Sequence, residues 1–184
     1  MNKAIASILT ALAIAGCESN AGPSVSTMLG YVVDAERDRS VWLTKEGVQI
    51  HSAAARPVAI ELPGWMYVGA PYCPPGLALG PKGEIVVTSN VIPTVWRIDR
   101  ETLAVTAHPL SLGVDGDKDV GFAAVVYAAE DRVFVAYSQT QRSVWRIDPS
   151  LKTATRVAQV DLDRIGRIKD CASYARRLSQ PRID

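Results

Sequence analysis

Short runs of alternating apolar and polar residues, separated by turns rich in glycine and charge, fill most of the chain after residue 27. Alternation with a period of two residues is typical of a β-strand that has one buried and one exposed face. The pattern predicts strands at 28–33, 40–44, 48–51, 76–79, 84–88, 94–98, 103–106, 122–127, 132–137, 143–147 and 153–157. The chain is therefore expected to be all-β.

An internal repeat organises these strands. The pentapeptide Val-Trp-Arg-Ile-Asp at 95–99 recurs letter for letter at 144–148, an interval of 49 residues, and a degraded copy, Ser-Val-Trp-Leu, stands at 40–43. A repeat of this length made of short strands indicates the blades of a β-propeller. At about 50 residues per blade, the predicted fold is a partial propeller of about three blades, each a four-stranded antiparallel sheet, whereas closed propellers have at least about four blades.

The blades are not equally clear in the sequence. Residues 76–106 and 122–157 each give four strands, whereas 28–51 gives three, which we interpret as the last three strands of a blade. The segment 56–76 is rich in proline and aromatic residues, and this predicts a long insertion between blades. Residues 161–184 fit either the start of a fourth blade or a short C-terminal helix with apolar positions at helical spacing.

The repeated pentapeptide has a structural interpretation. Trp96 and Trp145 should bury their rings between neighbouring blades, with the isoleucine two residues later on the same face. The arginine between them then points to the opposite face. Asp99 and Asp148 should cap the turn that follows the strand.

The first residues predict export and a lipid anchor. A basic start, Met1 to Lys3, precedes an apolar stretch of signal-peptide length, which ends in Ile14-Ala15-Gly16-Cys17. This ending resembles the bacterial lipobox, and the resemblance implies cleavage before Cys17 and a diacylglycerol on its thiol. The domains expected are a signal peptide at 1–16, a tether at 17–27, the propeller-like repeats at 28–160 and a C-terminal segment at 161–184. An ordinary signal peptide, which would leave a free thiol at Cys17, is the alternative.

Localisation and partners follow from the anchor and the charge. We expect a lipid-anchored protein of the bacterial cell envelope that faces the periplasm, and Glu18, where an aspartate would indicate inner-membrane retention, favours the outer membrane. The whole chain has 20 basic and 19 acidic residues, and loss of Lys3 with the signal would balance them. Such a balance gives no reason to expect nucleic acid as a partner. The expected partners are the membrane, through the lipid, and a protein partner or further copies of the chain, because a three-blade arc leaves sheet edges open.

Two cysteines remain besides Cys17. Cys73 and Cys171 could form a disulfide in an oxidising compartment, or both could stay free and buried. No histidine or third cysteine lies near either one in the sequence, so metal binding by this pair is not expected.

A family resemblance supports the fold. Residues 75–90 combine a proline and glycine, a glycine turn and a strand, and the Val-Trp-Arg-Ile-Asp strand follows. This segment resembles a blade of the NHL, SMP-30/gluconolactonase and YncE-like propellers, and the resemblance extends over residues 75–160. Those families include lactonases, ligand binders and interaction scaffolds, so the resemblance implies a fold and no single activity.

Candidate chemistry is sparse. Asp115, Asp117 and Asp119 alternate as calcium ligands do, but Val120 and Val126 stand where an EF-hand loop needs glycine and glutamate. These aspartates therefore form either a weak calcium site or an acidic turn, and no other cofactor is expected.

A lactonase-like metal site would have to draw on Asn90, Glu61 and Asp119, yet nothing in their spacing selects them. His51 and His108 are expected to be surface or hydrogen-bonded residues. The sequence thus favours a non-catalytic binding or assembly module, with a lactonase-type, metal-dependent hydrolase as the alternative.

Overall fold

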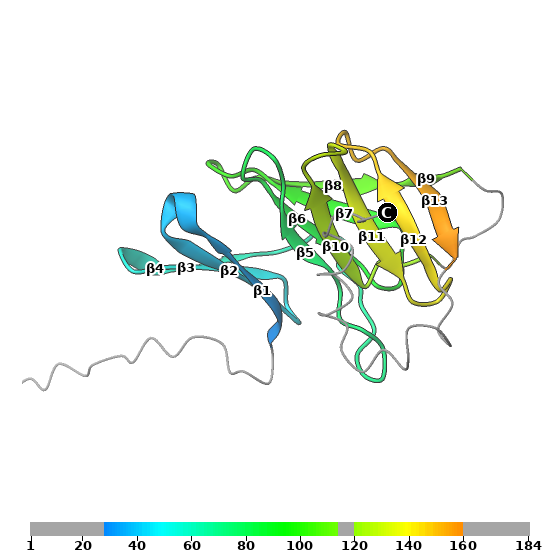
Figure 1. Cartoon of the computed structure of the whole chain (residues 1–184). Coiled ribbons are helices and arrows are strands. Elements are labelled where there is room, and N and C mark those ends of the chain that lie inside the picture. The colour runs from blue at the N-terminus through cyan, green and yellow to red at the C-terminus, as the bar shows by residue number, and fades with distance from the viewer. Residues whose placement is uncertain (1–27, 114–119, 160–184) are drawn as a thin grey trace, which may run out of the picture.

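The computed structural model describes residues 28–113 and 120–159, which fold into three antiparallel sheets placed side by side (Figure 1). In each sheet, four consecutive strands lie side by side in the order in which they occur in the chain. We call the three sheets blades 1, 2 and 3. Blade 1 contains β1 (Met28–Asp34), β2 (Arg39–Thr44), β3 (Val48–Ser52) and β4 (Ala55–Ile60), with a short 3-10 turn, η2 (Ala35–Arg37), between its first two strands. Blade 2 contains β5 (Leu77–Leu79), β6 (Ile85–Thr88), β7 (Thr94–Ile98) and β8 (Val105–Pro109). Blade 3 contains β10 (Ala124–Ala128), β11 (Val133–Ser138), β12 (Ser143–Ile147) and β13 (Thr153–Gln159).

One short strand joins two blades. β9 (Ser111–Leu112) follows β8 of blade 2 and pairs in parallel with β13, so that it becomes the fifth strand of blade 3. The first strands of the blades contact one another, β1 with β5 and β5 with β10. The first strand of each blade is therefore the inner one, and the described fold is the predicted all-β partial propeller of three blades.

The repeated tryptophans lie where the sequence predicts. Trp96 and Trp145 are both 0% exposed. Trp96 belongs to the apolar cluster between blades 1 and 2, and Trp145 to the cluster between blades 2 and 3. Ile98 and Ile147 are buried on the same faces, while Arg97 and Arg146 are exposed. The pentapeptide is thus a packing unit of the scaffold.

The aspartate that ends each pentapeptide holds the next turn. The carboxylate of Asp99 accepts hydrogen bonds from the backbone and side chain of Thr102, and that of Asp148 accepts bonds from Ser150 and Thr153. Burial alone would raise the pKa of Asp148, but the hydrogen bonds from Ser150 and Thr153 outweigh it and lower the pKa to about 2. Both aspartates are therefore turn residues, as predicted.

Blade 1 differs from the sequence interpretation in two ways. Its three predicted strands are the first three of the blade, and the fourth is β4, which occupies the beginning of the predicted insertion. Pro57 is tolerated there because β4 is the outer strand of its sheet and needs no further hydrogen-bonded neighbour. In addition, Trp42 lies on the second strand, β2, whereas Trp96 and Trp145 lie on third strands. The degraded copy of the repeat is thus not equivalent to the other two in the fold.

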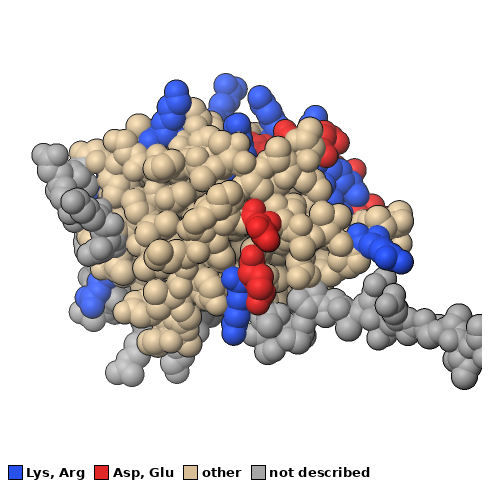
Figure 2. Space-filling view, turned by 180° about the vertical axis from the view of Figure 1, so that it is seen from behind, with Lys and Arg blue, Asp and Glu red and all other residues tan. Residues whose placement is uncertain are grey.

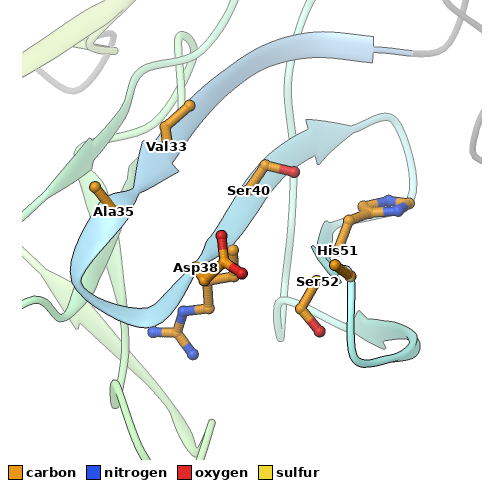
Figure 3. Close-up of a pocket in the computed structure, with 8 residues that line it drawn as sticks. Val33, Ala35, Asp38, Ser40, His51 and Ser52 are labelled. Carbon is orange, nitrogen blue, oxygen red and sulfur yellow. The ribbon is translucent and has the colours of Figure 1, made fainter.

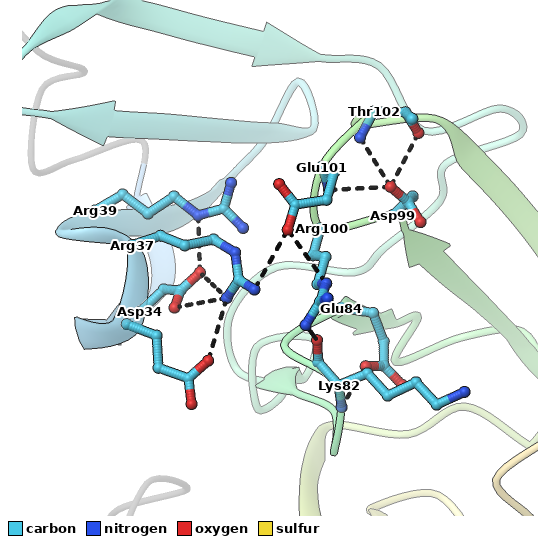
Figure 4. A network of polar contacts seen from close by, with 10 residues as sticks. Asp34, Arg37, Arg39, Lys82, Glu84, Asp99, Arg100, Glu101 and Thr102 are labelled. Carbon is cyan, nitrogen blue, oxygen red and sulfur yellow. Dashed lines mark hydrogen bonds and ion pairs between the residues drawn. The ribbon is translucent and has the colours of Figure 1, made fainter.

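Ion pairs connect blades 1 and 2 at the end that carries the turn between β1 and β2 (Figure 4). The buried carboxylate of Asp34 lies 2.8 Å from Nε of Arg39 and 3.3 Å from Arg37, and Arg37 lies 3.5 Å from Glu101 of blade 2. One guanidinium nitrogen of Arg39 is buried without a hydrogen-bond partner. At the opposite end, the blades are linked by the long connection between β4 and β5, which hydrogen bonds hold in place.

Candidate interaction surface

The connection between β4 and β5, residues 61–76, is the largest irregular segment that the structure describes, and we call it the platform. Its backbone is held by the loop that joins β6 to β7 in blade 2. The hydroxyl of Ser89 donates to the carbonyl of Met66 at 2.6 Å, and the side chain of Asn90 bonds both backbone groups of Val68 and the carbonyl of Cys73 at 2.8–2.9 Å. All three hydrogen bonds of the Asn90 amide therefore hold the platform in place.

Further contacts tie the platform to all three blades. The indole of Trp65 donates to the carbonyl of Lys45 in blade 1, and the indole of Trp96 in blade 2 donates to the carbonyl of Pro63. The amide of Cys73 donates to the side chain of Gln139 in blade 3 at 2.7 Å. Cys73 is also bonded in a disulfide. A segment anchored at this many points presents its outward side chains in a fixed arrangement.

The end of the platform packs so closely that glycine is required. A Cβ atom on Gly76 would lie 2.6 Å from the Thr88 hydroxyl and 2.7 Å from the backbone nitrogen of Val125. That same hydroxyl accepts a bond from the amide of Gly76 and donates one to the carbonyl of Phe122. Blades 2 and 3 and the platform therefore meet at Thr88.

The outward side of the platform is apolar. Met66 is 53% exposed, Tyr72 is 48% exposed and Val68 is 39% exposed, while Leu62 and Cys73 point inward and are buried. Of the seven large apolar side chains that are exposed among the described residues, these are three, and two more lie on β1. Apolar side chains held outward on a rigid backbone are typical of an interaction surface. The view from behind also shows a broad area without charged side chains (Figure 2).

The candidate metal ligands do not form a site in the described structure. Asn90 is committed to the platform, and Glu61 is exposed at its start. The three aspartates of the predicted calcium loop, Asp115, Asp117 and Asp119, lie outside the described residues. Within 28–113 and 120–159, no group of three histidine, cysteine or acidic side chains is arranged to hold a metal ion.

The two histidines lie apart, on different blades. His51 is on β3 and His108 is on β8, and the Nε2 atom of each is buried with no hydrogen-bond partner. Burial lowers the pKa of His108, and the charge of Arg97 lowers it further. The expectation that both histidines would be surface or hydrogen-bonded residues is therefore wrong for these nitrogens.

Several sequence predictions fall outside the described residues. They are the signal peptide at 1–16, the lipidated Cys17, the tether, and the C-terminal segment with Cys171. Cys73 is bonded in a disulfide, and its pairing with Cys171 stays a prediction. No helix among the described residues has the length and apolar character needed to cross a membrane.

Comparison with known proteins shows the fold alone. No protein-family model matches the chain, and no curated protein sequence matches it. Among solved structures, an auxiliary nutrient binding protein from Bacteroides thetaiotaomicron is similar at a TM-score of 0.51 and 11% identity, over 73% of this chain and 31% of that one. The hydrazine synthase of Kuenenia stuttgartiensis is similar at a TM-score of 0.50 and 11% identity, over 73% of this chain and 37% of that one. A streptogramin B lyase aligns at a TM-score of 0.48 and 16% identity, over 64% of this chain and 36% of that one. The chain thus spans about a third of the length of these structures. It shares the arrangement of a β-propeller with the two whose TM-scores are 0.50 and 0.51.

Proposed function

We propose that this protein is a non-catalytic binding or assembly module of the bacterial cell envelope, anchored by a lipid on Cys17, which uses its platform to bind another protein. The part of the proposal that concerns protein binding is supported by the structure of the platform. Its backbone is fixed to three blades while Met66, Val68 and Tyr72 remain exposed. A prearranged apolar surface binds without first having to order its own chain. A flexible loop, in contrast, loses conformational entropy when it binds.

The proposal favours binding over catalysis because the polar side chains that border the platform from the blades are already hydrogen-bonded to its backbone. The amide of Asn90, the hydroxyl of Ser89 and the side chain of Gln139 all bond the platform backbone. These residues stand on the loops between second and third strands, where the hydrolase alternative would place metal ligands.

The binding half is tested by photo-crosslinking in intact cells. A photoreactive phenylalanine analogue in place of Tyr72 should give a discrete crosslinked product with an envelope protein, and the additional change Met66→Ser should weaken that product. The matched control carries the analogue at Val157, which is 49% exposed on β13 and lies outside the platform. Equal crosslinking from both positions would contradict the proposal. Lactone hydrolysis that Asn90→Ala abolishes in a folded protein would instead support the hydrolase.

The anchoring half makes its own prediction. Cys17→Ser should move the protein from the membrane fraction to the soluble fraction, because the acyl chains supply the membrane affinity. The circular dichroism spectrum and thermal midpoint should not change, since the substitution lies before the first strand. Continued membrane association of this variant, measured by fractionation after a carbonate wash, would point to a different anchor.

A further inference from the structure

The first strand of the fold begins beside the platform. Met28, at the start of β1, pairs with Thr44 at the end of β2. The residue after Thr44 is Lys45, whose carbonyl accepts the hydrogen bond from the indole of Trp65 in the platform. Leu29 and Trp65 also pack against the same apolar cluster between blades 1 and 2. The other end of β1 leads into η2, where ion pairs join blades 1 and 2 (Figure 1). The start of β1 and the platform therefore lie at the same end of the blades.

This position would keep the platform near the membrane. The eleven residues of the tether, 17–27, separate the proposed lipid on Cys17 from Met28. At roughly 3.5 Å per residue, even a fully extended tether would span no more than about 40 Å. A protein embedded in the same membrane would therefore meet the platform at a raised local concentration.

The two ends of the blades differ in charge. Residues 62–76 of the platform contain no charged side chain. At the opposite end, the turns of blades 1 and 2 bring together acidic and basic residues, among them Arg37, Lys82, Glu84, Asp99, Arg100 and Glu101 (Figure 4). A hollow of about 460 Å³ on blade 1 also lies at that end, where Asp38, Ser40 and His51 are among the residues that line it (Figure 3). The end that the anchor would hold near the membrane is thus the one with the uncharged platform.

Two features favour a protein over the lipid itself as the occupant of the platform. Elements that bind a bilayer surface are rich in lysine and arginine, which anionic headgroups attract, and residues 62–76 have neither. The platform is also irregular, and an exposed irregular backbone does not enter the hydrocarbon, because its polar groups would lose their hydrogen bonds to water. By contrast, exposed Met66 and Tyr72 on a surface without charge match the composition of protein interfaces, where methionine and tyrosine are enriched and lysine and glutamate are depleted.

We propose that the platform binds a protein embedded in the membrane that holds the lipid anchor, at an uncharged apolar surface which that protein exposes on the periplasmic side. Met66, Val68 and Tyr72 would lie at the centre of the contact. The charged end of the blades would then point away from the membrane. The proposal rests on the proposed function, since it names the class of protein that the platform binds.

The test uses the whole mature chain without a lipid of its own. The Cys17→Ser variant is exported behind an ordinary cleavable signal peptide, with the photoreactive phenylalanine analogue in place of Tyr72. After crosslinking in cells, a carbonate wash removes proteins that are not embedded in the membrane. The uncrosslinked chain should be washed away, whereas the crosslinked product should remain in the membrane pellet. Val68→Lys should reduce this product by about tenfold or more, because an unpaired charge would enter an apolar contact. Met66→Ser serves as the second variant if Val68→Lys does not fold, as judged by circular dichroism.

The control carries the analogue at Val33, which is 62% exposed near the other end of β1. It should give no product in the washed membranes, and an equal product from Val33 and Tyr72 would overturn the proposal. A Tyr72 product that the wash extracts would also overturn it, but would leave protein binding by the platform intact. Absence of any protein product from Tyr72 would overturn both proposals.

Vesicles of phosphatidylethanolamine and phosphatidylglycerol test the lipid as the occupant. The purified chain without its lipid should not sediment with these vesicles, since the platform has no basic residue to attract them. Sedimentation with the vesicles that Val68→Lys abolishes would show that the platform binds the bilayer, and would overturn the proposal.

Discussion

Replacing Trp96 or Trp145 by alanine should lower the free energy of unfolding by about 3–5 kcal/mol each, the range for large buried aromatic residues. Both rings are 0% exposed between blades. Trp96 packs edge-on against Trp65 at 5.3 Å and bonds the carbonyl of Pro63, and Trp145 packs against Phe122 at 5.9 Å. Each substitution therefore removes contacts that hold two blades together.

Urea unfolding followed by circular dichroism measures this effect without relying on the tryptophans as probes. Trp42→Ala is the matched control, because Trp42 lies on β2 of blade 1 and is only partly buried. It should lower the free energy of unfolding clearly less than the other two substitutions. If quenchers reached Trp96 and Trp145 in the native protein, the structural interpretation of the repeat would be wrong.

Reduction of the disulfide at Cys73 should lower stability by a few kcal/mol. The chain has only two other cysteines, Cys17 and Cys171, and lipidation of Cys17 would leave Cys171 as the partner. A bond from Cys73 to Cys171 closes a loop of about a hundred residues, for which the chain-entropy model gives roughly 4–5 kcal/mol. Loss of this bond also frees one anchor of the platform, so the reduced protein should aggregate more readily.

Unfolding with and without reductant measures the effect, and peptide mapping under non-reducing conditions identifies the partner. Cys73→Ser and Cys171→Ser should destabilise the protein equally, while Cys17→Ser should not destabilise it. A bond between Cys73 and Cys17 would contradict both the pairing and the lipid anchor. Two free thiols in a stable monomer would contradict the pairing alone.

Local features of the fold could be read from the sequence because they depend on neighbouring residues. Strand alternation located the strands of blades 2 and 3, and the repeated pentapeptide placed Trp96 and Trp145 on equivalent buried positions. The aspartate that follows each copy bonds the next few residues along the chain, so its role in the turn was also visible. The fold class followed from these repeats.

Blade 1 shows where local patterns fail. The letters around Trp42 match those around Trp145, and both indoles bond a serine two residues earlier, yet the two strands hold different places in their sheets. Strand order depends on which segments pair, and the proline in β4 concealed the fourth strand of the blade. A proline is acceptable on an outer strand, but the sequence does not show which strand is outermost.

The candidate surfaces were decided by the tertiary structure. Asn90 could have been a metal ligand or a structural residue, and only contacts with residues about 20 positions away show that it holds the platform. Tyr31 and Val33 have the alternation of an ordinary strand, and they are exposed because no described blade covers that face. The sequence by itself determined which residues form strands and turns, since those depend on short-range geometry. Which faces are covered depends on how many sheets pack together and in what order, and that is a property of the whole arc.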